Sequence, residues 1–253
     1  MAIHGDNTPE RSTARVAPIL AIVLPLLAVL PVPGSATSSA FPPLIALPAG
    51  FHPEGIETGR GSSFYLGILA GGDLLRGDYR TGIVQTLAPS PGPGAAAAGL
   101  KVDPRTNHLF VSAITFGARV YDARTGALLQ EYPFTTAGPY APFINDVAVT
   151  RDAAFFTDSC STTLFTLPLG PGGRLPDPSA VQALALTGEF EFVPIPYPGG
   201  AYPCYPNMNG IVATDNGRWL IVNNTATEEL FRVDPRTGAS VQIAILNAQF
   251  GTP

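Results

Sequence analysis

The sequence has few of the residues that most often bind metals or act as nucleophiles. Its 253 residues include two cysteines, three histidines, two methionines and one tryptophan, and only 13% of them are charged. It contains no Cys-x-x-Cys pair, no His-Glu-x-x-His and no histidine-rich tract, which removes most metal-cluster chemistry. The Gly-x-Ser-x-Gly turn and the phosphate-binding P-loop are absent as well.

Positive charge is also scarce. Fourteen basic residues stand against 19 acidic ones, for a net charge of −5, so no basic face is available to neutralise the phosphates of a nucleic acid. By contrast, 45% of the residues are hydrophobic, and glycine and proline number 27 each. That composition is too apolar for a disordered chain and too rich in turn formers for a mostly helical one. We expect one globular, all-β domain.

The first forty residues have the three parts of a secretory signal. Arg15 precedes an uncharged apolar run over residues 16–32, and small residues follow up to Ala40. Three prolines interrupt the run, and its 17 residues are short for a membrane span. We therefore predict a signal peptide over residues 1–40, cleaved after Ala36 or Ala40, and a secreted product with no remaining membrane span. An uncleaved signal anchor is the alternative.

Export would allow the two cysteines to pair. Cys160 and Cys204 are 44 residues apart, and a disulfide closing that interval would stabilise the fold by roughly 3–4 kcal/mol through its effect on the unfolded chain. Two separate buried thiols are the alternative. Asn223 begins an Asn-Asn-Thr glycosylation sequon, which is meaningful only if a eukaryote secretes the chain.

Internal repeats indicate the architecture. Similar segments begin at Gly55, Gly99, Asp146 and Gly210, which gives spacings of 44, 47 and 64 residues. Each holds short strands separated by polar turns, and each closes on a Thr-Gly or Gly-Gly turn. Four short strands per unit are typical of a β-propeller blade, and the first two spacings match the length of one.

The repeats also predict individual strands. The third spacing is long because of a Pro- and Tyr-rich insertion over residues 176–206, and residues 88–98 are expected to form a loop. Residues 41–253 are then one propeller domain, with Trp219 and many phenylalanines between its blades. The expected second strands are 108–112, 153–157 and 218–222; the third are 118–121, 163–167 and 229–233; the fourth are 83–87, 127–132 and 240–245.

Six segments resemble the SMP-30/gluconolactonase/LRE-like group, and the nearest branch consists of poorly characterised secreted proteins. They are residues 51–56, 98–103, 143–147, 155–159, 209–213 and 230–235. The resemblance spans about Phe51 to Gly238. It implies six blades, whereas four repeats are countable here, so we expect an incomplete propeller, the product of a C-terminal truncation.

The resemblance also implies a site. The group holds a divalent cation, commonly calcium, and its first ligand is a glutamate that corresponds to Glu54 here, while a later asparagine ligand corresponds to Asn209. An Asn-Asp pair that contacts substrate corresponds to Asn145 and Asp146. A third, carboxylate ligand of the group would fall beyond Asn247. Phe143 stands where the group's gluconolactonases carry arginine, which argues against a sugar lactone as the substrate.

The repeats support this convergence independently. Glu54, Asn145 and Asn209 each stand just before a repeat start, and equivalent positions of a radial repeat face the same axis. Carboxylate and amide oxygens suit hard cations such as calcium or magnesium. The cation would polarise the carbonyl of a lactone or ester, and a carboxylate would activate the attacking water.

Each of these residues also has a purely structural interpretation. Glu54 could be a solvated charge before a turn, and Asn209 or the Asn145-Asp146 pair could form Asx turns. Asp158 could reach the channel or bond the backbone of the next blade, and His52 could assist acid-base chemistry or be structural. His108 is expected to be structural, and the repeated Asp-Pro-Arg-Thr-Gly is expected to be a turn device. The first function that remains is a secreted, cation-dependent lactone or ester hydrolase. The alternatives are a non-catalytic propeller that binds a ligand or protein partner, and an inactive truncated product.

Overall fold

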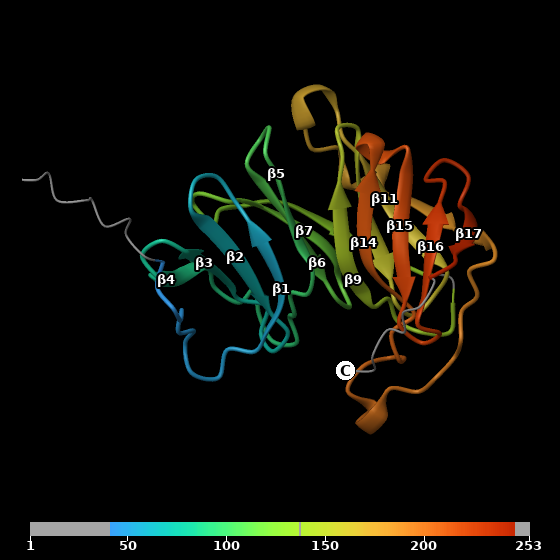
Figure 1. Cartoon of the computed structure of the whole chain (residues 1–253), viewed down its shortest axis with the longest axis horizontal. Helices are drawn as coiled ribbons and strands as arrows, with labels where there is room; N and C mark the ends of the chain where they lie inside the picture. The colour runs from blue at the N-terminus through green and yellow to red at the C-terminus, as the bar shows by residue number, and fades with distance from the viewer. Residues whose placement is uncertain (1–40, 137, 246–253) are drawn as a thin grey trace, which may run out of the picture. The chain divides into compact units, whose positions relative to one another are not determined.

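The computed structural model describes residues 41–136 and 138–245 (Figure 1). All of them belong to one compact unit, Ser39–Pro253. The predicted signal sequence, residues 1–40, lies outside the described residues. No helix among the residues described is long and apolar enough to cross a membrane.

The described residues form four antiparallel sheets, in the order of the four repeats. The first contains β1 (Pro53–Thr58), β2 (Ser63–Ile68), β3 (Leu74–Asp78) and β4 (Val84–Ala88). The second contains β5 (Leu100–Asp103), β6 (His108–Ala113), β7 (Gly117–Asp122) and β8 (Leu128–Pro133). The third contains β9 (Ile144–Val149), β10 (Ala153–Asp158), β11 (Thr163–Pro168) and β12 (Gln182–Ala185). The fourth contains β14 (Met208–Thr214), β15 (Trp219–Asn224), β16 (Glu229–Val233) and β17 (Ala239–Ile243), and β13 (Thr187–Gly188) pairs in parallel with β17.

The repeated Asp-x-Arg-Thr-Gly motif makes the turn between the last two strands of a sheet, as predicted. In the second sheet the carboxylate Oδ1 of Asp122 accepts the backbone N–H groups of Arg124 at 2.9 Å and Thr125 at 2.7 Å. Gly126 follows with φ of 75°, a left-handed conformation that favours glycine. This local chemistry reverses the chain within a few residues and fixes the register of the hairpin.

Apolar clusters join successive sheets. Tyr65 and Leu109 belong to the cluster between the first and second sheets, and Phe110 and Phe156 to the one between the second and third. Phe155 and Phe231 belong to the cluster between the third and fourth. Neighbouring residues of one strand therefore enter different clusters, because side chains alternate between the two faces of a strand. The first strands of the sheets, β1, β5, β9 and β14, lie next to one another in that order, and we call them the inner strands (Figure 1).

The segment before β1 covers the other face of the first sheet. Ile45 and Leu47 pack against the buried Phe64 and Leu66, and they leave a cavity of about 550 Å³ that Tyr79 also lines. The outer face of the fourth sheet carries Trp219 instead.

Trp219 was expected between blades, and the described residues show one side of that position. It is half-buried on the face of the fourth sheet that points away from the third, with the guanidinium of Arg232 4.7 Å from the centre of its ring. The residues described supply no further sheet to cover it.

The long third repeat differs from its prediction in one respect. The segment 176–206, expected as an insertion, contains both β12, the fourth strand of the third sheet, and β13. The predicted disulfide between Cys160 and Cys204 is confirmed, with the two Cα atoms 5.6 Å apart. It ties the end of the insertion to the turn after β10.

Candidate functional site

A break in strand pairing occurs at each position that the repeats marked as a site. In β1, Glu54 and Gly55 stand opposite the single residue Gly67, between the pairs that Pro53 and Ile56 make with β2. Two residues against one is the pattern of a β-bulge, which re-aims side chains and is common beside active sites.

The third and fourth sheets repeat this bulge. Asn145 and Asp146 in β9 stand opposite Thr157 alone, and Asn209 and Gly210 in β14 stand opposite Asn223 alone. All four predicted site residues are therefore bulged residues of inner strands. The same bulge thus positions these residues in three sheets, whereas unrelated turns would not be expected to recur at equivalent positions.

Asp146 connects the inner strands. Its Oδ1 accepts the backbone N–H of Val147 at 2.8 Å, and its Oδ2 accepts the N–H of Ile211, in the next sheet, at 3.0 Å. Burial raises the pKa of the carboxyl, and these two hydrogen bonds lower it by a smaller amount. A Cβ atom at Gly99 would overlap Oδ1, so the approach of β9 to the start of β5 requires glycine there.

Glu54 faces the same region from the first sheet. The residue is exposed to solvent, but the protein surrounding its carboxyl desolvates it, and the negative charge of Asp146 adds to that effect. Together they raise the pKa of Glu54 to about 7. The negative charge of Asp146 thus disfavours the charged form of Glu54.

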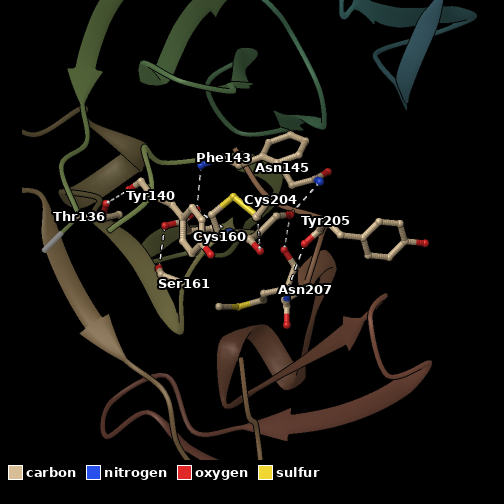
Figure 2. Close-up of a disulfide and its surroundings, with 12 residues drawn as sticks. Thr136, Tyr140, Phe143, Asn145, Cys160, Ser161, Cys204, Tyr205 and Asn207 are labelled. Carbon is tan, nitrogen blue, oxygen red and sulfur yellow. Dashed lines mark hydrogen bonds between the residues drawn. A yellow bond between two sulfur atoms is a disulfide. The ribbon is translucent and has the colours of Figure 1, made fainter. Parts of the chain in front are cut away.

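Asn145 is fixed by a buried network. Its Nδ2 donates to Ser159 Oγ at 3.0 Å, and that hydroxyl donates to the carbonyl of Met208 at 2.8 Å. The Ser159 carbonyl also lies 3.3 Å from Cys204 Sγ, and Figure 2 shows Asn145 beside the disulfide. The disulfide and the site therefore share one rigid support.

Asn209 belongs to a second polar network. The side-chain amides of Asn209 and Asn223 both donate to Thr225 Oγ1, at 3.1 and 3.2 Å. Thr157 Oγ1 donates to the Asn209 carbonyl at 2.6 Å. Asn223, predicted as a glycosylation acceptor, is half-buried and stands opposite the Asn209 bulge, so the structure places it within the site.

Two charged residues of the site were missed by the sequence analysis. Lys101 on β5 donates from Nζ to Glu57 Oε2 on β1 at 2.7 Å. Both residues line a cavity of about 330 Å³, together with Asp146 and the backbones of the inner strands. The available signal was that Lys101 is the only lysine in the sequence.

The remaining candidates take structural positions. Asp158 is fully buried, and its carboxylate accepts the backbone N–H groups of Phe143 at 2.8 Å and Cys160 at 3.0 Å. Both donors lie beside strands of its own sheet, so the expected bond to the backbone of the next blade is wrong. His52 is exposed, and His108 is half-buried at the start of β6, where burial lowers its pKa.

An aromatic surface borders the site. Phe143 and Tyr202 stack with ring centres 4.8 Å apart and planes 14° apart, and Tyr197 meets Tyr202 edge-on at 4.8 Å. Burial raises the pKa of Tyr202, and electrostatic interactions with Tyr197 and Glu54 raise it further. Figure 2 shows Phe143 next to the disulfide and the ring of Tyr205 pointing away from it.

No group of three or more His, Cys, Asp or Glu side chains that could hold a metal exists among the described residues. A hard cation would therefore need amide oxygens beside the carboxylates of Glu54 and Asp146. Asn209 is a predicted source of such an oxygen, and its amide nitrogen, not its oxygen, is the atom that bonds Thr225.

Solved structures share this fold. Virginiamycin B lyase from Staphylococcus aureus, in a catalytically inactive form with quinupristin, matches with a TM-score of 0.56 and 13% identity over 79% of this chain and 58% of its own. A protein from Lactobacillus plantarum matches with a TM-score of 0.55 and 16% identity over 77% and 55%. The β-propeller domain of Cps50 (Swd1) from Myceliophteria thermophila matches with a TM-score of 0.52 and 16% identity over 77% and 56%.

No protein-family model and no curated protein matches the sequence. The chain spans between 55% and 58% of the length of these three structures. Identities this low show the fold alone.

The fold is thus a β-propeller of four-stranded blades, and the described residues supply four sheets of it. The site that the blades share lies on the bulged inner strands.

Proposed function

We propose that this propeller protein binds a divalent cation, calcium by preference, at the bulges of its inner strands and hydrolyses a small ester or lactone there. The observation that carries the proposal is the placement of Glu54, Asn145, Asp146 and Asn209 in three equivalent bulges. The resemblance to the SMP-30/gluconolactonase/LRE-like group points to the same residues and to the same chemistry.

The residues fit a hard cation in part. Glu54 and Asp146 repel each other, and a bound dication would relieve that repulsion. Glu54 would supply a carboxylate oxygen and Asn209 an amide oxygen, both of which calcium accepts. No three carboxylates of the described residues come together closely enough to hold one ion, and Glu57 is paired with Lys101, so we expect weak binding, because affinity for calcium rises with the number of charged ligands.

The chain's own residues supply the rest of the reaction. A bound cation would act as a Lewis acid on the carbonyl of the ligand. Asp146 would take a proton from the attacking water, and its two backbone hydrogen bonds hold the carboxylate in place while leaving lone pairs free. Burial raises the pKa of Asp146, which makes it a stronger base than an exposed aspartate. Asn145 would hold the bulge in shape through Ser159.

Calorimetric titration of the purified protein with CaCl₂ tests the cation, and 4-nitrophenyl acetate and γ-butyrolactone test the reaction. We expect Glu54→Gln to weaken calcium binding about tenfold or more, since it removes the charged ligand. Glu191→Gln is the matched control, because Glu191 is exposed outside the site. Equal titrations for wild type and Glu54→Gln would remove Glu54 from the site.

Secretion is part of the same proposal. The predicted signal sequence and the Cys160–Cys204 disulfide are both typical of an exported protein. Amino-terminal sequencing of protein recovered from culture medium would test it, with a new terminus after Ala36 or Ala40 as the expected result.

A non-catalytic propeller is the second candidate. It is favoured by the half-buried rings of Tyr197, Tyr202 and Tyr205, which lie together and offer partly apolar contacts to a ligand. Binding of calcium without hydrolysis of either substrate would favour this candidate over the hydrolase.

A further inference from the structure

The only lysine of this protein lies on an inner strand and opens into the cavity shared by the four sheets. Of 253 residues, 14 are basic, and 13 of these are arginines. Lys101 is on β5, and its cavity is lined by residues of β1, β5, β9 and β14. Lys101 thus lies in the wall of a cavity between the inner strands, whereas the arginines of the described residues lie mainly in turns or on the surfaces of the sheets.

Glu57 holds Lys101 in place. The Nζ–Oε2 distance is 2.7 Å, and the Glu57 side chain is only 14% exposed, whereas that of Lys101 is 45% exposed. An ammonium group carries three N–H donors, and Glu57 is the one hydrogen-bond partner of Nζ in the described part of the chain. Donors therefore remain for a ligand in the cavity.

Asp146 lines the same cavity but makes no ion pair with Lys101 within 4.0 Å in the described structure. A cationic donor and a carboxylate thus face one volume of about 330 Å³ without neutralising each other directly. That volume is large enough for the reacting group of a small ligand between them.

The charges around the cavity indicate what kind of ligand fits. Lys101 contributes one positive charge, while Glu57 and Asp146 contribute two negative ones, and Glu54 lies nearby. An anionic ligand is disfavoured by this excess of negative charge. A neutral carbonyl compound offers an oxygen to Lys101, and it develops negative charge on that oxygen only when it reacts.

We propose that Lys101 is a catalytic residue of the propeller, which donates a hydrogen bond to the carbonyl oxygen of a neutral ester or lactone held in this cavity. The inference rests on the hydrolase proposed above and adds a residue to it. The oxygen of water forms a bond to the carbonyl carbon, and Asp146 takes a proton from that water. The carbon–oxygen bond to the leaving group then breaks, and the leaving oxygen takes the proton back, which yields an acid and an alcohol.

Lys101→Met and Lys101→Arg test the catalytic role. Loss of one oxyanion donor lowers kcat by about 100-fold to 1,000-fold, so Lys101→Met should lower kcat for 4-nitrophenyl acetate to that extent. Lys101→Arg, which keeps a charged donor, should restore part of the rate. Arg119→Met is the matched control, because it breaks a comparable ion pair, with Glu131 at 2.8 Å, outside the site.

A second measurement uses the wild-type protein and needs no activity. An acetylating reagent modifies only Lys101 and the terminal amine, and acetylation blocks trypsin after Lys101, so peptide 81–105 replaces peptide 81–101. We expect γ-butyrolactone to slow acetylation of Lys101 without slowing that of the terminal amine.

The two measurements separate the inference from the proposed function. Protection of Lys101 without hydrolysis would overturn the hydrolase and keep the carbonyl site. Hydrolysis that is unaffected in a folded Lys101→Met, with no protection, would overturn the role of Lys101 and keep the hydrolase. If neither hydrolysis nor protection is observed, both fall.

Discussion

The guanidinium of Arg105, in the second repeat, hydrogen-bonds the main chain of the third repeat at Thr150. Its Nη2 donates to the Thr150 carbonyl at 2.9 Å, and its Nη1 donates to the next carbonyl, that of Arg151, at 2.6 Å. Asp103 orients the guanidinium through an ion pair of 2.9 Å and is itself 1% exposed. An arginine of the Asp-Pro-Arg-Thr motif, expected only to serve a turn, thus also fastens two blades together.

Arg105→Ala should lower the free energy of unfolding by about 1–3 kcal/mol, because it leaves the buried Asp103 carboxylate without its charged partner. Arg236→Ala is the matched control: Arg236 occupies the same motif and pairs only with its own Asp234, with its side chain 81% exposed. That change should stay within about 0.5 kcal/mol. Urea unfolding followed by fluorescence measures both, and equal effects would show that the contact between sheets contributes nothing.

The free energy of unfolding should fall as the pH rises, because Glu54 loses its proton. Its pKa is about 7 in the folded protein against an ordinary 4.5, so the folded state binds the proton more tightly than the unfolded state. The resulting stabilisation is complete below pH 4.5 and is lost as the pH rises through 7. Wild type should therefore lose more stability between pH 5 and pH 8 than Glu54→Gln, in urea unfolding at both values. A parallel pH dependence of the two proteins would contradict the interaction with Asp146.

The disulfide should hold the Tyr-rich segment against the site. Replacing both Cys160 and Cys204 by serine should cost about 2–5 kcal/mol and release the segment before β14. Each tyrosine of that segment is followed by proline, but Phe192 is followed by Val193, and the segment has no arginine or lysine, so chymotrypsin reports on it and trypsin does not. Faster chymotryptic cleavage after Phe192 is the expected result, and unchanged cleavage would mean that aromatic stacking alone retains the segment.

Gly99 should tolerate no side chain. A Cβ atom there would overlap Asp146 Oδ1 and lie 2.7 Å from Asp146 Cα, so Gly99→Ala must push β9 away from β5. Overpacking of this kind costs about 1–3 kcal/mol. Gly138→Ala is the control, since nothing lies within 4 Å of its Cβ position. A thermal melt of both variants, with the calcium titration repeated on Gly99→Ala, would show whether the site is displaced.

Repetition made most of the fold predictable. The strand predicted at residues 229–233 is β16, and the other expected second and third strands agree with the structure to within two residues at either end. The alternation of apolar residues and the residues that form the turns are local features, so a single repeat is enough to predict its strands and turns. The strand at residues 182–185 was missed because it lies in a Pro-rich stretch that no other repeat resembles.

The site was predictable only in part. Glu54, Asn145 and Asn209 do occupy equivalent positions, because bulged residues recur at the same place in three of the repeats. Lys101 and Glu57 were not found, since their ion pair joins two repeats and neither repeat shows it alone. Which face of a sheet is covered depends on the neighbouring sheets, so the surroundings of Trp219 could not be read from the alternation of its own strand.

The short strand β13 has a consequence for how these molecules behave at high concentration. The outermost strand of a sheet offers unpaired backbone groups to any passing strand, and this is a common route to aggregation. Here the Thr187 N–H donates to the Gly238 carbonyl at 2.9 Å, and the Ser240 hydroxyl donates back to the Thr187 carbonyl at 2.6 Å. The connection between the third and fourth sheets therefore covers part of the edge of β17. Because a segment of the same chain already pairs there, a strand of another molecule is less able to add to this sheet.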